Sequence, residues 1–142
     1  MTLREREMTF NPQLTKNFHI KEWNCKEGGG TGVPWDLVDN VTRCATNLQV
    51  LRNEIGEAVR IISGWRGPLY NAKVGGAKKS QHLKGLAADI RVSGMKPEEV
   101  ASIIEDLIEH KKMDEGGLGI YHGAKHGFVH YDCRLTKARW VG

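Results

Sequence analysis

One acid inside an apolar run places the strongest constraint on how this chain of 142 residues folds. Asp89 lies in the largely apolar run 86–92. A carboxylate in such a run destabilises the fold unless a partner or a metal neutralises it. In a strand, alternation points Asp89 to one face and its apolar neighbours to the other, so we expect Asp89 to face a site. Gly85 permits a turn that brings His82 back beside it.

A second run, residues 127–133, has the alternation that is typical of a strand and puts His130 and Asp132 on one face. Joined with His82 and Asp89, His130 completes a candidate zinc site of two histidines and one carboxylate, with the fourth position left for water. An ordinary buried histidine–carboxylate pair fits the same spacing, because the chain has six histidines. Spacing alone leaves both interpretations open.

Short motifs along most of the chain resemble one known family. In sequence order they are Ser63-Gly64-Trp65-Arg66, Asn71, Val74-Gly75-Gly76-Ala77, Ser80-Gln81-His82, Gly85-Leu86-Ala87-Ala88-Asp89, Gly117-Leu118-Gly119-Ile120-Tyr121, Phe128-Val129-His130-Tyr131-Asp132 and Trp140. Together they resemble the zinc D-Ala-D-Ala carboxypeptidase and murein endopeptidase family, whose fold is shared with the hedgehog signalling domain. The resemblance implies an α+β fold, in which a small antiparallel sheet carries the metal ligands and helices pack on one side. It also implies Zn²⁺ as the cofactor, held by His82, Asp89 and His130.

The sequence predicts one domain over residues 18–142, which the resemblance implies is peptidase-like, preceded by a loose arm over residues 1–17 that has no hydrophobic period. A long helix is expected from Pro34 to just before Gly56, and an amphipathic helix over 97–112. The shorter predicted elements are strands at 58–62, 86–92, 118–121 and 127–133 and a helical turn at 70–74.

Composition argues against several classes of partner. The formal net charge is +4, and the basic residues form only two short groups without interleaved aromatic side chains, so we expect no nucleic-acid partner. No run approaches the about 20 apolar residues of a membrane span, and we expect a monomer that acts without a membrane. Cys25, Cys44 and Cys133 are odd in number and unclustered, which favours free thiols in a reducing compartment.

The first eight residues carry charges with no apolar segment behind them, unlike a secretory signal peptide. This predicts cytoplasmic synthesis followed by action on the cell wall, as in a phage or prophage lysis protein. A periplasmic or extracellular protein whose leader is missing from the sequence is the alternative.

Arg66 lies just past the strand predicted at 58–62. On the sequence alone, an arginine on the surface after a turn explains this position. The family resemblance implies instead that Arg66 lies near the substrate's carboxylate, a task that suits its planar fork of donors.

The general base is not supplied by the family motif. Many relatives carry an acid three residues before the last zinc ligand or a histidine two residues before it, where this chain has Gly127 and Phe128. His126 is the first candidate for the base and His122 the second, because the pKa of histidine suits proton transfer near neutral pH. A solvent-exposed loop histidine is the alternative for each. Asp132 is expected to be either a carboxylate that supports His130 by a hydrogen bond or an acid of the core.

The resemblance therefore implies a zinc-dependent peptidase that hydrolyses peptide bonds in peptidoglycan stem peptides or cross-links, as a carboxypeptidase or an endopeptidase. The alternative is a non-catalytic zinc-containing domain of the same fold that binds cell wall or a protein. The sequence does not distinguish cleavage of D-Ala-D-Ala, of L-Ala-D-Glu or of a cross-link.

Overall fold

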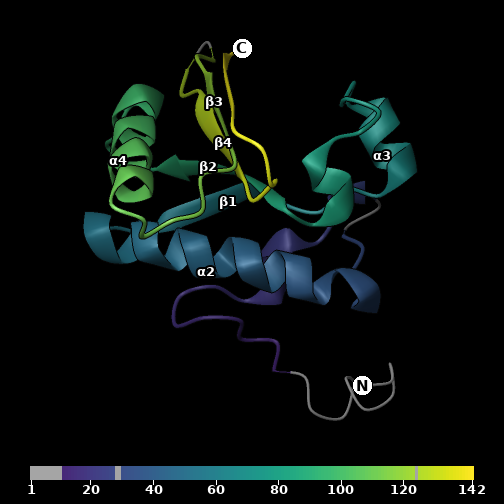
Figure 1. Ribbon diagram of the computed structural model, residues 1–142. Coiled ribbons are helices and arrows are strands. Elements are labelled where there is room, and N and C mark those ends of the chain that lie inside the picture. Colours follow the sequence, from purple (N-terminus) through teal and green to yellow (C-terminus); the bar gives the residue numbers. More distant parts are fainter. Residues whose placement is uncertain (1–10, 28–29, 124) are drawn as a thin grey trace.

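The computed structural model describes residues 11–27, 30–123 and 125–142, and it shows an α+β fold (Figure 1). The elements are, in order, η1 (Ile20–Trp23), η3 (Trp35–Leu37), α2 (Val38–Ile55), β1 (Val59–Ser63), α3 (Pro68–Lys73), η4 (Gln81–Lys84), β2 (Ala87–Val92), α4 (Pro97–Glu109), β3 (Gly117–Tyr121), β4 (Phe128–Asp132) and β5 (Ala138–Val141). The five strands form one sheet in the order β1-β2-β4-β3-β5. The predicted fold class is confirmed.

The sheet is mixed, which adds one strand to the predicted antiparallel arrangement. The pairs β1–β2, β2–β4 and β4–β3 are antiparallel, whereas β5 pairs in parallel with β3. The sequence analysis placed no strand after residue 133, because four residues are too few to show a clear alternation. Only pairing with β3 defines β5: the backbone N–H of Ala138 donates to the carbonyl of Gly116, and that of Gly142 donates to the carbonyl of Ile120.

The two long helices have the expected positions. After η3, α2 runs to Gly56, which ends it in the left-handed conformation at φ 75° and donates its N–H to the carbonyl of Arg52. The other helix, α4, stops at Glu109 and not at residue 112, because Lys111 has φ 60° and leaves the helical region. In Figure 1, α4 and α3 lie at opposite sides of the molecule, and α2 extends along the sheet below them.

The core lies between the sheet and the helices α2 and α4. It contains Ala88 and Ile90 of β2 and Val129 and Tyr131 of β4, packed with buried apolar residues of both helices. Since side chains alternate along a strand, these residues force Asp89, His130 and Asp132 onto the opposite face. A slip of one residue in either strand would carry a charged group into the core, so the hydrophobic pattern fixes the register of the site.

Residues 11–17 contact α2. The hydroxyl of Thr15 and the backbone N–H of Asn17 both donate to Oε1 of Gln49, each at 2.8 Å. Residues 1–10 of the predicted arm lie outside the described residues, and the division into an arm and a domain stays a prediction. Among the described helices, none has the length and apolar character needed to cross a membrane.

Candidate metal centre

His82 reaches the sheet from a short helix placed by its two ends. Ser80 caps η4 by accepting the backbone N–H of His82, and Gly85 ends it with φ 72°, a conformation that favours glycine. This turn brings the imidazole back over β2, where Nε2 of His82 lies 3.2 Å from Oδ1 of Asp89. The expectation that Gly85 allows His82 to return to Asp89 agrees with this geometry.

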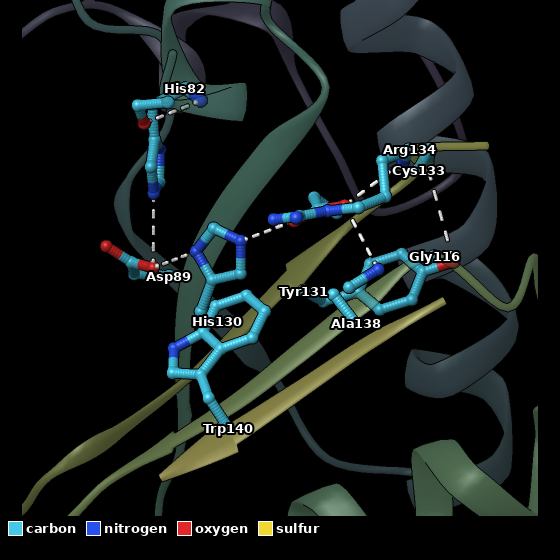
Figure 2. Close-up of polar contacts among 12 residues, drawn as sticks. His82, Asp89, Gly116, His130, Tyr131, Cys133, Arg134, Ala138 and Trp140 are labelled. Atoms are coloured by element: carbon cyan, nitrogen blue, oxygen red, sulfur yellow. Dashed lines mark hydrogen bonds and ion pairs between the residues drawn. The ribbon is translucent and has the colours of Figure 1, made fainter. Parts of the chain in front are cut away.

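His130 arrives from the neighbouring strand. Asp89 of β2 and His130 of β4 are directly paired in the antiparallel register, and Nδ1 of His130 lies 3.0 Å from Oδ1 of Asp89. The three residues are 3%, 4% and 7% exposed, and one ligand atom from each lies within 4.8 Å of the others. Figure 2 shows both imidazoles directed at the same carboxylate. We call His82, Asp89 and His130 the metal cluster.

In each histidine, one ring nitrogen points toward Asp89 (the inner nitrogen) and the other points away from it (the outer nitrogen). The partner of the outer nitrogen determines which of the two carries the proton. Nδ1 of His82 lies 2.7 Å from the carbonyl oxygen of Gly64, and Nε2 of His130 lies 2.7 Å from Oδ2 of Asp132. Both partners are acceptors, so each outer nitrogen carries a proton and donates it. In neutral histidines the inner nitrogens then present lone pairs to a carboxylate oxygen. Three acceptors that converge in this way repel one another unless a proton or a metal cation lies between them, and the donor set is one that suits zinc.

The electrostatics of the cluster also favour a cation. Burial alone would raise the pKa of Asp89, but when protons take the place of a metal, hydrogen bonds from His130 and His82 lower it well below the ordinary value of 3.8. Burial alone would lower the pKa of His130, but the carboxylates of Asp132 and Asp89 raise it above its ordinary value. Asp132 also has a lowered pKa, because the bonds from His130 and Arg134 outweigh its burial. Two ionised carboxylates therefore flank His130.

Asp132 is fully buried and holds His130 in place. Its Oδ1 accepts the backbone N–H of Gly117 at 3.0 Å, while Nε and Nη2 of Arg134 bind the two carboxylate oxygens at 2.9 and 2.8 Å. These bonds hold in place the carboxylate that determines the tautomer of His130. The geometry agrees with the supporting carboxylate expected from the sequence, and it adds Arg134 as the next partner.

Trp140 covers the other side of His130. Their ring centroids are 5.0 Å apart, and Nε1 of Trp140 donates to the hydroxyl of Tyr121 at 2.7 Å. Gly119 faces His130 across the β3–β4 pair, and a Cβ at Gly119 would collide with the Trp140 ring. The guanidinium of Arg134 lies 5.3 Å from the centroid of the same ring. The last strand thus supplies an aromatic wall for the metal cluster.

Arg66 contacts the metal cluster directly. Its Nη2 lies 3.2 Å from Oδ2 of Asp89, its Nε donates to the hydroxyl of Ser63 at 3.2 Å, and its Nη1 lies 3.5 Å from Oδ1 of Asn71. The side chain is 17% exposed, so part of the guanidinium remains accessible. Arg66 therefore occupies the free oxygen of Asp89 and lies at the edge of the site. Its predicted role as a substrate clamp stays a prediction.

The metal cluster opens into a cavity of about 400 Å³. The walls are Arg66, the segment 74–77, Lys79, Ser80, Gln81, Tyr121, Phe128, Arg134 and Trp140. Outside the metal cluster, none of the described lining residues is a histidine or a carboxylate. A substrate carbonyl can thus reach the metal cluster through a mouth with three cationic side chains and aromatic walls.

His126 and His122, the two candidates for the general base, lie outside the lining of the cavity of the metal cluster. Nδ1 of His122 lies 3.4 Å from a carboxylate oxygen of Glu98 on α4, and His126 lines a different cavity. The loop between β3 and β4 passes the end of the sheet, where Nε of Arg91 donates to the carbonyl of Gly127 at 2.7 Å, and this directs the loop away from Asp89. Neither histidine lines the cavity of the metal cluster in this geometry, and the catalytic role of both stays a prediction.

A sequence model of the peptidase M15 family matches residues 14–132, a span that contains the whole metal cluster. The chain belongs to the peptidase M15 family. This confirms the resemblance drawn from the motifs. Peptidases of the M15 family depend in general on zinc, in agreement with a donor set of two imidazoles and one carboxylate. Comparison with curated protein sequences returns no match.

Several residues around the metal cluster of this member of the M15 family were not assigned from the sequence. Trp140 and Gly119 appeared in the motifs, but their contact depends on the parallel pairing of β5 with β3. Arg134 follows Asp132 by two residues, and this spacing alone did not indicate that the two side chains bind each other. Tyr121 was placed on a strand, without any indication that it stacks on Phe128 with centroids 4.5 Å apart and lines the cavity.

Proposed function

We propose that this M15 peptidase is a zinc-dependent hydrolase of peptide bonds in peptidoglycan stem peptides or cross-links. The observation that carries the proposal is the convergence of two imidazole lone pairs and one carboxylate oxygen at the bottom of an open cavity. A structural metal site is closed by protein ligands, whereas a catalytic site keeps a position for water or substrate. Three protein ligands beside an open cavity support the catalytic type.

The residues of the chain divide the work of the proposed reaction. His82, Asp89 and His130 would hold zinc, which when bound supplies a Lewis acid for the scissile carbonyl and lowers the pKa of water to about 7. Asp132 accepts the Nε2 proton of His130, so the Nδ1 lone pair is directed toward Asp89, where the metal would bind. Arg66 fixes Asp89 and presents the accessible part of its guanidinium to an anionic group of the substrate.

The proton acceptor is proposed to be His126 or, failing that, His122, as the sequence suggested. Since neither lines the cavity of the metal cluster, this role requires the β3–β4 loop to move when substrate binds. His126→Ala and His122→Ala test the idea separately: the true base should lose at least about a hundredfold in kcat with unchanged zinc content. Full activity in both variants would exclude both histidines.

A second candidate function is a non-catalytic zinc domain that binds cell wall or a protein. One specific observation favours it: among the described residues around the cavity, only the metal cluster contributes a carboxylate or a histidine. A peptidase of this kind needs a group that accepts a proton from water and passes it to the leaving amine.

Digestion of purified peptidoglycan by the zinc-loaded chain tests the proposed function. We expect about one zinc per chain and new muropeptides, whose masses identify the bond that is cut. His82→Ala should lose both zinc and hydrolysis, whereas the matched control His110→Ala, at an exposed position, should keep both. Stoichiometric zinc without any hydrolysis would reject the peptidase and support the binding domain. Equal zinc content in His82→Ala would reject the metal cluster itself.

A further inference from the structure

A second cavity, of about 510 Å³, lies at the end of the sheet where β1 and β2 run past the start of β4. Among its lining residues, only His126 has a role in the proposed hydrolysis. Phe128 lines both this cavity and the cavity of the metal cluster, so the two cavities share one aromatic wall residue. We call this second hollow the arginine cavity.

Two arginines of the arginine cavity are placed against each other without a counter-charge. Arg60 of β1 and Arg91 of β2 are directly opposite in the antiparallel register, an arrangement that destabilises a sheet when the two charges are alike. His126 adds a third basic group to the lining. Within the described part of the chain, no acid lines the cavity and no carboxylate forms an ion pair with either arginine. The unpaired charge is suited to an anionic ligand.

The arginine cavity is also organised before any ligand arrives. Nε of Arg91 donates to the carbonyl of Gly127 at 2.7 Å, which fixes the guanidinium and leaves its terminal N–H groups without a protein partner among the described residues. A guanidinium fixed in this way loses less conformational freedom when it binds a carboxylate. Apolar side chains complete the lining, namely Met95, Pro97, Val100 and Val129. The cavity therefore suits a carboxylate attached to an apolar body.

The position of Arg91 relates the arginine cavity to the bond that would be cut. Asp89 and Arg91 point to the same face of β2, and two residues of strand separate them by about 7 Å. An extended peptide advances by about 3.3 Å per residue, so two of its residues also span about 7 Å. A substrate lying along this face therefore brings a carboxylate about two residues from the reacting carbonyl to Arg91 and to its cross-strand neighbour Arg60.

We propose that the arginine cavity is a subsite for a free carboxylate of the substrate, about two residues from the bond that is cut. Arg60 and Arg91 bind the carboxylate, and the apolar lining takes the adjoining chain. This inference rests on the proposed function for the identity of the substrate, although binding at the cavity can be measured without hydrolysis. It makes Arg60 and Arg91 determinants of specificity, selecting stem peptides with free acids over amidated ones.

Nuclear magnetic resonance titration of the zinc-loaded chain tests binding directly. The probes are acetyl-L-Ala-D-Glu-amide and its D-Gln counterpart, which differ only in one carboxylate. We expect the acidic probe to shift the backbone signals of residues 91–95 and to bind at least about fivefold more tightly than the amide probe. Arg60→Gln should remove this preference and Arg60→Lys should keep part of it. The control Arg52→Gln, on α2 outside the cavity, should leave it unchanged.

Equal affinity for the two probes, or signal shifts confined to the cavity of the metal cluster, would overturn the inference. Hydrolysis gives the second measurement, with solubilised wall fragments compared before and after chemical amidation of their carboxylates. For the acidic fragments, Arg60→Gln should raise KM about fivefold to tenfold with kcat unchanged. Hydrolysis that ignores both amidation and Arg60→Gln would leave the proposed function standing and reject the subsite. Carboxylate-selective binding without hydrolysis would reject the peptidase and keep the subsite.

Discussion

Replacing Asp132 with Asn removes one charge and one acceptor from the side chain that holds His130. Oδ2 of Asp132 accepts from Nε2 of His130, and Oδ1 accepts from the backbone N–H of Gly117. An amide has one oxygen, so in either orientation its NH₂ group faces a donor. If NH₂ faces His130, the imidazole is stabilised in the tautomer with its proton on Nδ1, the atom that should bind the metal.

The expected cost follows from the bonds that Asp132 makes. Loss of one hydrogen bond to a charged group costs about 1.5–3 kcal/mol. The side chain of Arg134 is 28% exposed and can be hydrated in the variant, which reduces this cost. We therefore expect the free energy of unfolding without metal to fall by about 1–2 kcal/mol. Zinc should bind about 10-fold to 100-fold more weakly, the usual effect of removing a partner of a metal-bound histidine.

Competition with a chromophoric chelator at pH 7 measures the zinc affinity of Asp132→Asn, and urea denaturation measures its stability. The control Asp36→Asn, at an exposed position, makes the same change of charge away from the sheet and should match the unmodified chain. If Asp132→Asn bound zinc as tightly as the unmodified chain, Asp132 would not set the tautomer of His130 and the argument for the metal cluster from hydrogen bonding would fail.

Three further predictions use the same structure. Arg66→Lys should keep one zinc per chain and lower kcat/KM about tenfold, because lysine retains the charge beside Asp89 but loses the fork; a loss of stability as large as the loss of activity would make Arg66 structural. Gly119→Ala should lower the free energy of unfolding by about 1–3 kcal/mol, because its Cβ requires Trp140 to move, and an unchanged melting temperature would contradict this. Without metal, the raised pKa of His130 contributes stability that is complete below pH 6.5 and is lost at higher pH. The lowered pKa of Asp89 contributes stability that is lost below about pH 4. Urea denaturation from pH 3 to pH 9 should therefore show a maximum between these limits, and saturating zinc should abolish the decline on the alkaline side, since metal binding requires the unprotonated imidazole.

Most elements of the fold were predictable because their signals are local. The alternation in 86–92 and 127–133 specified two strands, and it also specified that Asp89 and His130 leave the core together. The apolar spacing of α2 and its glycine end were equally visible. These patterns determine which face of each helix or strand is buried. The sequence carries this information within a few consecutive residues.

Other features depend on which strands become neighbours, and no local pattern contains that information. β5 is defined by its parallel pairing with β3, and this pairing places Trp140 against His130. The approach of Arg66 to Asp89 joins residues that are 23 apart in the sequence. His126 is four residues from His130 in sequence, yet the β3–β4 hairpin carries it to the arginine cavity.

The motifs of the sequence thus indicated the family and its implied metal ligands, and the strand patterns determined the face on which Asp89 and His130 lie, because apolar neighbours leave these two residues only one direction to point. The tertiary structure decided the tautomers of His82 and His130, the partners of Arg66, the position of His126 and the opposition of Arg60 and Arg91. Each of these is a contact between side chains brought together by strand register and hairpin path, and the free energy of such a contact depends on a neighbour that is distant in sequence.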